Sequence, residues 1–315
     1  MKNKRLILLS PSNIEEKEDL LLIANELELN YLLIPKRVFK LKTFSKVLSL
    51  IDMILFCVKY KPFIILGTPN FQNRITSYFL GIKYITYMRA IHANSKVLTS
   101  FSDYIYKYLN FISNKSFLIN NYQADFCIVS SKITKQFLIE RGINNNKIII
   151  CGPIWLKKYN KLKNGGNKRR LIYITQAYKE HRLYEADKGQ KEYVKFLKKI
   201  SSDLGLELYL KIHPRDKTNY DNCNILKVSP EEFFNIVMID DVVLSPFSTL
   251  AFELMYLGGN IKFVTFKGID KIYEEIYKKY NIEILKNLNK ENLESEFRDY
   301  SIFKEIDIKN IKNFL

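Results

Sequence analysis

Short strand-like runs alternate with helical stretches along almost the whole chain, and this alternation constrains the fold more than any other feature. Apolar runs at 126–130 and 147–151 close the first half, and others at 171–175 and 207–212 open the second. Strands that alternate with helices are typical of βαβ units, in which the strands form a parallel sheet. The sequence therefore predicts an α/β fold built on parallel sheets.

The chain divides at one polar segment. Residues 159–168 are polar, contain two glycines and lack periodicity, which is typical of a linker between domains. At 315 residues the chain suits two domains of ordinary size. We therefore predict two Rossmann-like domains, 1–156 and 171–315, joined by a basic linker over 157–170.

The net charge of +17 indicates an anionic partner, such as a nucleic acid, an acidic membrane face or an anionic substrate. An aromatic stretch over 100–113 is interpreted as a core helix, with a helix on a membrane face as the alternative. No helix-turn-helix, zinc-finger or RNP-type motif is found, so no nucleic-acid partner is expected. Cations cluster in the linker and also at Lys36, Arg37, Lys40 and Lys42.

The cysteine pattern and the lengths of the apolar runs indicate the cellular compartment of the protein. The longest apolar stretch, 47–58, is interrupted by Ser49 and Asp52 and is too short to span a bilayer. No CxxC pair occurs, so we expect reduced thiols in a cytoplasmic protein, without a zinc site or a disulfide framework. The cysteines are Cys57, Cys127, Cys151 and Cys223.

The most informative motif is Lys-Ile-His-Pro-Arg at 211–215, which follows an alternating apolar run. His213 is therefore expected at the carboxyl end of a strand, the edge at which open α/β sheets bind ligands. Pro214 restricts His213 to extended backbone and helps to orient its ring. A buried structural histidine is the alternative interpretation.

Two later helices begin with polar side chains. Ser248 and Thr249 follow the predicted strand 242–245, where hydroxyls, backbone amides and the helix dipole together can hold a phosphate. A simple N-cap is the alternative. Glu232 opens a helix after a strand at 224–228, either as a helix-capping carboxylate or as an acceptor for ribose hydroxyls.

Gln176 directly follows the predicted strand 171–175 and precedes an acidic stretch that is predicted to be a loop. Asp187 in this loop is the candidate base that removes a proton from a hydroxyl, and Glu180 and Glu185 are its alternatives. A turn or N-cap role is the other interpretation of Asp187.

The order of these features resembles bacterial sialyltransferases of the lipooligosaccharide, polysialic-acid and marine-bacterial types. Those families carry an acid–Gly motif, a His-Pro motif and paired hydroxyls on two Rossmann-like domains, and the resemblance covers mainly residues 171–260. The chain departs from them at Asp187-Lys188-Gly189, where Lys188 replaces a second acid. The resemblance implies a GT-B-type fold facing a central cleft, with an N-terminal acceptor-binding domain and a C-terminal nucleotide-sugar-binding domain.

The resemblance further implies an inverting, metal-independent glycosyltransferase without a cofactor. It would move sialic acid, or a related nonulosonic acid, from its CMP ester to a hydroxyl of a glycan or glycolipid in lipopolysaccharide or capsule synthesis. Asp187 would be the base and His213 the acid. The net charge suits peripheral contact with an anionic inner membrane. The implied nucleotide-binding residues are Gln176, His213, Pro214, Glu232, Ser248 and Thr249.

Acceptor recognition is assigned to the first half, on polar residues near predicted strand ends. Two other functions stay open: a CMP-Kdo or CDP-polyol transferase of capsule or teichoic-acid type, and a non-catalytic protein that binds anionic lipid or nucleic acid. The acceptor candidates are Ser10, Ser12, Asn70, Arg74 and Arg89.

Overall fold

The computed structural model describes two compact units. Unit 1 holds the described residues up to 91, from 124 to 157 and from 302 to 315, and unit 2 holds those from 158 to 294. The cation cluster at 36–42 and the aromatic stretch at 100–113 lie outside the described residues. The described residues are 6–12, 14–34, 43–91, 124–159, 161–163, 165, 169–285, 288–294, 302–303 and 305–315.

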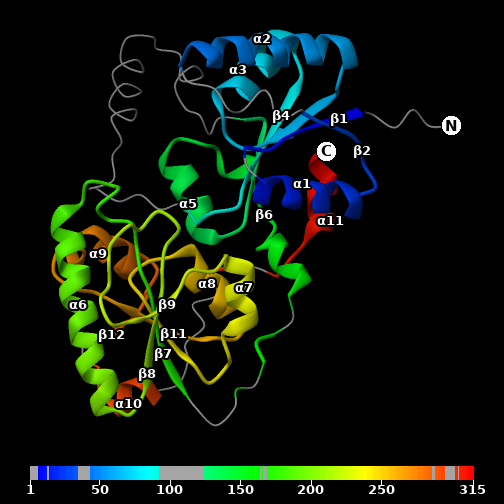
Figure 1. The fold of residues 1–315 in the computed structure, drawn as a ribbon. Helices are drawn as coiled ribbons and strands as arrows, with labels where there is room; N and C mark the ends of the chain where they lie inside the picture. The colour runs from blue at the N-terminus through cyan, green and yellow to red at the C-terminus, as the bar shows by residue number, and fades with distance from the viewer. Residues whose placement is uncertain are drawn as a thin grey trace. The chain divides into compact units, whose positions relative to one another are not determined.

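The described part of unit 1 contains a parallel sheet with the strand order β2-β1-β3-β4-β5-β6 (Figure 1). Every residue of β3 is buried, as is typical of parallel strands that helices cover on both faces. The strands are β1 (Leu6–Ser10), β2 (Asn30–Leu33), β3 (Ile64–Gly67), β4 (Lys83–Met88), β5 (Phe126–Val129) and β6 (Ile148–Ile150).

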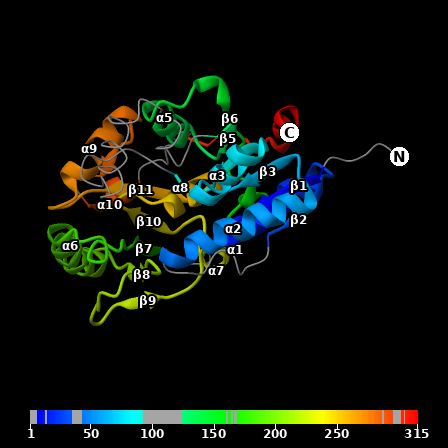
Figure 2. The ribbon, with the colours of Figure 1, turned by 90° about the horizontal axis from the view of Figure 1, so that it is seen from above.

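Helices cover both faces of this sheet. Met53 and Phe137 share one core cluster with Tyr84 of β4, whereas Tyr87 of β4 contacts Asp19 on the other face. Two of these helices, α2 and α3, lie side by side (Figures 1 and 2). The helices are α1 (Ile14–Glu26), α2 (Thr43–Tyr60), α3 (Phe71–Leu80) and α5 (Lys132–Glu140), with short 3-10 turns η3 (Asn145–Lys147) and η4 (Ile154–Lys158).

The end of the chain packs with unit 1, although the sequence placed it in the C-terminal domain. The amide of Lys132 donates to the carbonyl of Ile302 at 2.9 Å. The rings of Phe126 and Phe314 pack at 5.1 Å. The segment includes α11 (Ile308–Ile311) and η5 (Lys312–Phe314).

The described part of unit 2 contains a second parallel sheet, with the order β12-β11-β10-β7-β8-β9. The prediction of two parallel-sheet, Rossmann-like domains is thus confirmed. The strands are β7 (Arg170–Ile174), β8 (Glu207–Lys211), β9 (Asn224–Leu226), β10 (Val242–Ser245), β11 (Asn260–Val264) and β12 (Ile284–Leu285).

One helix of unit 2 starts earlier than predicted. Glu185, Asp187 and Gly189 therefore lie on α6 and not in a loop. Carboxylates in a first turn are favoured by the helix dipole, and this preference was overlooked in the sequence. The helices are α6 (Tyr184–Asp203), α7 (Pro230–Ile236), α8 (Thr249–Tyr256), α9 (Asp270–Lys279) and α10 (Lys290–Glu294).

Lys157 of the predicted linker belongs to unit 1 and pairs with Glu26, whereas the other described linker residues belong to unit 2. Arg170 forms an ion pair with the buried Asp241, with Nη2 and Oδ2 2.5 Å apart, and also donates to the carbonyl of Ile236. The amide of Leu162 donates to the carbonyl of Leu257 at 3.1 Å. At these residues the basic segment is packed structure, which its polar sequence did not indicate.

Candidate nucleotide site

The strand order of unit 2 reverses between β7 and β10. The chain moves outward from β7 to β8 and β9, returns to β10 and continues to β11 and β12. In open α/β sheets ligands bind outside the carboxyl ends of the strands at such a switch point. Gln176 follows β7 and Ser248 follows β10, so these two residues flank it. His213 follows β8, two strand spacings or about 10 Å from β10.

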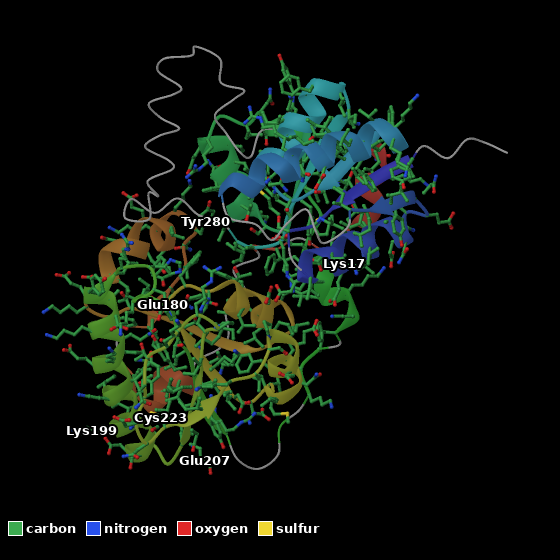
Figure 3. All side chains as sticks on the ribbon, turned by 45° about the horizontal axis from the view of Figure 1, so that its top comes forward. Lys17, Glu180, Lys199, Glu207, Cys223 and Tyr280 are labelled. Atoms are coloured by element: carbon green, nitrogen blue, oxygen red, sulfur yellow. The ribbon has the colours of Figure 1, made fainter. Side chains whose placement is uncertain are left out.

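Figure 3 separates the two edges of this sheet. Glu180, which follows β7, lies at the carboxyl edge. Glu207, the first residue of β8, lies toward the opposite end of unit 2. The sequence-predicted site residues after β7, β8 and β10 thus share one edge.

Two hydrogen bonds fix His213. Its backbone amide donates to Oγ1 of Thr175 at 3.0 Å, and its Nδ1 accepts from the amide of Arg215 at 3.1 Å. Because Nδ1 is an acceptor, the neutral ring carries its proton on Nε2. Pro214 lies between these residues, is exposed and shapes the turn. The half-buried imidazole can therefore donate Nε2–H to a ligand.

Burial lowers the pKa of His213, and the nearby positive charges of Arg215, His181 and Lys211 lower it further, against the opposing charge of Asp216. The imidazole is therefore neutral at pH 7. A neutral Nε2–H stabilises a phosphate by hydrogen bonding, and an arriving phosphate dianion would favour the protonated ring.

The hydroxyl of Ser248 is not used as a helix cap. Ser248 stands at the N-cap position of α8 with extended backbone, but its side chain forms no capping hydrogen bond. Ser248 and Thr249 are both partly exposed. The hydroxyl of Ser248, at the positive end of the α8 dipole, therefore remains available for an anion.

Buried polar atoms without a partner accompany this helix end. Among the described residues, no group hydrogen-bonds to Gln176 Nε2, Ser245 Oγ or Thr265 Oγ1, although each atom is buried. Such atoms are rare in folded proteins and call for a ligand or an ordered water. Gln176 follows β7, Ser245 ends β10 and Thr265 follows β11. Strands β7 and β10 form the switch point, and β11 is the neighbour of β10.

The structure shows the capping role for Glu232. Its Oε2 accepts from the amide of Ser229 at 2.8 Å, and its own amide donates to Oγ of Ser229 at 3.1 Å. This reciprocal pair is a capping box. The hydrogen bond from the Ser229 amide lowers the pKa of Glu232. One carboxylate oxygen is thus already engaged, and ribose binding stays a prediction.

The three candidate bases occupy different positions. Asp187 is buried and forms an ion pair with Lys191 at 2.7 Å. It also accepts from the hydroxyl of Thr218 at 3.2 Å. Glu180 is exposed and accepts from the amide of Lys217 at 3.3 Å, whereas Glu185 is exposed on the first turn of α6. These contacts show Asp187 joining α6 to the loop after His213.

Two side chains of this edge were missed in the sequence. Gln190, on α6, holds Gln176 by accepting from its amide at 2.8 Å and donating to its carbonyl at 2.9 Å. Lys211 is buried, donates to the carbonyl of Ile212 at 3.0 Å and has its pKa lowered by burial. Gln190 could have been predicted from the sequence, because a polar residue on the buried face of a helix needs a hydrogen-bond partner. Lys211 is the first residue of the motif 211–215 and could have been considered with His213.

Unit 1 has its own switch point, between β1 and β3. Ser10 Oγ donates to Oδ1 of Asn73 at 2.6 Å, and the hydroxyls of Ser12 and Thr68 form a hydrogen bond. Gly67 is required here, since a Cβ would lie 2.5 Å from the carbonyl oxygen of Ser10. Most of these polar groups are thus bonded to one another.

The other three acceptor candidates lie at different places in unit 1. Asn70 is the N-cap of α3 and accepts from the amide of Asn73 at 2.7 Å. Arg89 forms an ion pair with Asp19 at 3.3 Å and lies over the ring of Trp155. Arg74 lines a hollow at the opposite, amino-terminal edge of the sheet, where β4 and β5 begin.

Within the described residues, no group of three or more His, Cys, Asp or Glu side chains is placed to hold a metal ion. In the same ranges no helix combines the length and the apolar character needed to cross a bilayer.

Comparison with known proteins identifies the fold. No protein-family model and no curated protein matches the chain. Among solved structures, the Methanocaldococcus jannaschii UDP-GlcNAc 2-epimerase in complex with UDP-GlcNAc and UDP is 13% identical, and the match covers 98% of this chain and 99% of that one with a TM-score of 0.58. The Neisseria meningitidis UDP-GlcNAc 2-epimerase bound to UDP-GlcNAc is 10% identical, with coverages of 92% and 89% and a TM-score of 0.55.

A third match is the glycotransferase of kitacinnamycin, at 9% identity, coverages of 90% and 86%, and a TM-score of 0.51. At these identities the likeness establishes the fold, a GT-B-like pair of Rossmann-like domains.

These matches correct the sequence interpretation. The resemblance to sialyltransferases, the CMP-sialic acid donor and the CMP-activated partner were wrong, since the two epimerases described above are UDP-GlcNAc 2-epimerases with UDP-GlcNAc bound. The CMP-Kdo and CDP-polyol alternatives fall with them. A His-Pro turn and hydroxyls at a helix N-terminus are general devices for holding a phosphate, so they identify neither the base nor the reaction.

Proposed function

We propose that the chain is an enzyme that acts on a UDP-activated sugar, with a 2-epimerase of UDP-GlcNAc as the leading candidate. The observation that carries the proposal is the carboxyl edge of unit 2, where the uncapped hydroxyl of Ser248 and buried, unpartnered polar atoms follow or end neighbouring strands. Gln176, His213 and Thr249 complete the proposed nucleotide site, and Pro214 orients His213.

The chemistry fits this arrangement. Changing the configuration at C2 requires the C2–H bond to break, and departure of the diphosphate from C1 allows it. A base takes the C2 proton, the electron pair of the C2–H bond forms a C1=C2 double bond, and the C1–O pair leaves with UDP. Return of a proton to the opposite face of C2 and of UDP to C1 then gives the epimer. As UDP departs, negative charge grows on the diphosphate, where Nε2–H of His213 and the hydroxyl of Ser248 would stabilise it. The helix dipole adds to this effect.

Ligand preference tests the nucleotide assignment. Isothermal titration should give tighter binding for UDP than for CMP, and UDP-GlcNAc should raise the unfolding temperature. Tighter binding of CMP would contradict the proposal.

Two amide replacements of His213 test which ring nitrogen donates to the ligand. Because Nε2 is the proposed donor, His213→Gln, whose amide nitrogen lies near the Nε2 position, should retain more UDP affinity than His213→Asn, whose amide lies near Nδ1.

Turnover tests the reaction. With UDP-GlcNAc in D₂O, NMR should show the C2 epimer with deuterium at C2, because the hydrogen is lost and replaced during inversion. Failure to incorporate deuterium, with intact UDP binding, would exclude the epimerase and leave the nucleotide site standing.

A second candidate is a transferase that uses a UDP-sugar donor. The carboxylates of Asp19 and Glu16 at the carboxyl edge of unit 1 are both engaged, since Asp19 pairs with Arg89 at 3.3 Å and Glu16 accepts from the amide of Ser12 at 3.0 Å. UDP release that requires an added hydroxyl acceptor would favour the transferase over the epimerase.

Peripheral membrane association also belongs to the proposal. It is supported by the net charge of +17, which favours contact with anionic lipid.

A further inference from the structure

An apolar stripe runs along the solvent face of α2, beside the exposed side chains of Asp52 and Lys59. Ile51, Leu55 and Val58 are 47%, 61% and 52% exposed, and their spacing places them in one stripe along the helix. Met53 and Cys57 are buried in the core cluster of unit 1. A surface helix of this kind normally carries polar residues on its outer face, so α2 departs from the usual pattern on the side away from the core.

Helix α3 extends this apolar surface. Tyr78 and Phe79 are 60% and 70% exposed, and α3 lies beside α2 (Figures 1 and 2). Phe63, between the two helices in sequence, is also exposed. We define the apolar patch as Ile51, Leu55, Val58, Phe63, Tyr78 and Phe79.

Two neighbouring hollows connect the patch to cations. A hollow of about 430 Å³ is lined by Val58 and Phe63, and another of about 690 Å³ by Tyr78. Both hollows share Gly81 and Lys83, so they adjoin. The larger one is also lined by Arg74, Lys83 and Lys147.

The charge around the patch is strongly positive. Asp125 is the one acidic residue lining the larger hollow, and its Oδ2 accepts from the amide of Tyr84 at 2.8 Å. Lys59 and Lys61 are exposed at the end of α2 and just beyond it.

We propose that the α2–α3 face of unit 1 docks on an anionic lipid bilayer. The apolar patch would enter the headgroup–acyl boundary, and the exposed cations Lys59, Lys61 and Lys147 would bind lipid phosphates. Apolar and aromatic side chains flanked by lysines are typical of interfacial helices, and tyrosine suits a surface that is apolar on one side and wet on the other. The proposal locates the membrane contact and is independent of the reaction that unit 2 supports.

Vesicle flotation tests the proposal with the full chain. It should float with phosphatidylcholine vesicles that contain phosphatidylglycerol, and salt should weaken the binding by screening. The Leu55→Glu/Val58→Glu variant should bind these vesicles at least about tenfold more weakly, because two apolar side chains no longer leave water. Phe79→Glu, a single change at the most exposed patch residue, should act in the same direction.

The matched control is Ile14→Glu, which changes a side chain of 63% exposure on α1, a helix that packs on the other face of the sheet. It should float like the unchanged protein, and thermal unfolding should be similar for all variants. Equal binding to phosphatidylcholine alone, or equal loss in the Ile14 control, would overturn the proposal. A dimer in light scattering that the Leu55/Val58 variant dissociates, without flotation, would replace the bilayer with a second copy of the chain.

Discussion

The backbone amide of His213 donates a hydrogen bond to Oγ1 of Thr175 over 3.0 Å, and this bond joins the ends of β8 and β7. Thr175 is fully buried, and its own amide donates to the carbonyl of Lys211 at 3.0 Å. The His-Pro turn is thus anchored to the central strand at the switch point of unit 2. The position of the imidazole depends on a hydroxyl that the sequence marked only as a strand end.

Thr175→Val removes that hydroxyl and keeps the side-chain shape. The His213 amide then loses its acceptor, so we expect the free energy of unfolding to fall by about 1–3 kcal/mol. UDP affinity should fall by about tenfold, since a displacement of the ring costs one charge-assisted hydrogen bond.

Urea unfolding and isothermal titration measure these two effects. The control is Thr76→Val on α3, because Thr76 is buried and its Oγ1 has no partner among the described residues. Unchanged UDP affinity in Thr175→Val would show that the hydrogen bond does not position His213.

Ser248→Ala separates ligand binding from helix capping. Replacing a serine that caps a helix costs about 1 kcal/mol, but the Ser248 side chain forms no capping bond. We therefore expect a loss of stability below about 0.5 kcal/mol, together with a UDP affinity lower by at least about tenfold, as for one hydrogen bond to a charged group.

The control is Ser131→Ala, at the N-cap of α5, whose side chain accepts from the amide of Thr134. It should show the reverse result: about 1–2 kcal/mol of lost stability and unchanged UDP affinity. A large loss of stability in Ser248→Ala would mean that its hydroxyl caps α8 after all.

The alternation of elements predicted most of the fold because its cause is local. A buried run such as 242–245 is a strand in any parallel sheet, and its bounds agree with those of β10. Helix α3 lies in one of the helical intervals that this alternation predicts between strands, and Asn70 and Gly81 cap its two ends. The packing of Ile302 onto unit 1 depends on tertiary contacts that no local pattern encodes.

The site could be predicted in part. Strand-end polarity located His213 and Ser248 at the correct edge, but the sequence does not contain the strand order that makes this edge a switch point. Glu232 follows the capping-box spacing with Ser229, and that local signal is the contact found. Identification of the donor failed because a phosphate site looks alike whichever nucleoside carries the phosphate.

Gly189 is required for packing and not for a turn. A Cβ at this position of α6 would lie 1.9 Å from the carbonyl oxygen of Lys267. Gly189→Ala should therefore destabilise the protein by at least about 2 kcal/mol as an overpacking change, although alanine is the better helix former by about 1 kcal/mol. Lys188→Ala, an exposed neighbour on the same helix, should change stability by less than about 0.5 kcal/mol. Equal melting curves for the two variants would show that α6 and the loop at Lys267 separate freely.

The buried Asp19 makes the stability of unit 1 depend on pH. Burial raises the pKa of Asp19 to about 6, against the opposing effect of the Arg89 guanidinium, and the hydroxyl of Tyr87 donates to its Oδ2 at 3.0 Å. Because the folded-state pKa lies above the unfolded value, the folded protein binds more protons between about pH 4 and pH 6. The contribution of Asp19 to stability is therefore fully present below pH 4 and is lost as the pH rises through 6.

Asp19→Asn mimics the protonated carboxyl and removes this titration. The stability of the variant relative to the unchanged protein should rise between about pH 4 and pH 6, by at most about 3 kcal/mol, and stay constant above that window. Chemical unfolding at a series of pH values measures the difference. The opposing charge of Arg89 is already part of the balance that sets the pKa of Asp19 at about 6, so its effect is contained in this change. A difference that falls with rising pH would mean that the ion pair outweighs burial, and that Asp19 is held as a carboxylate.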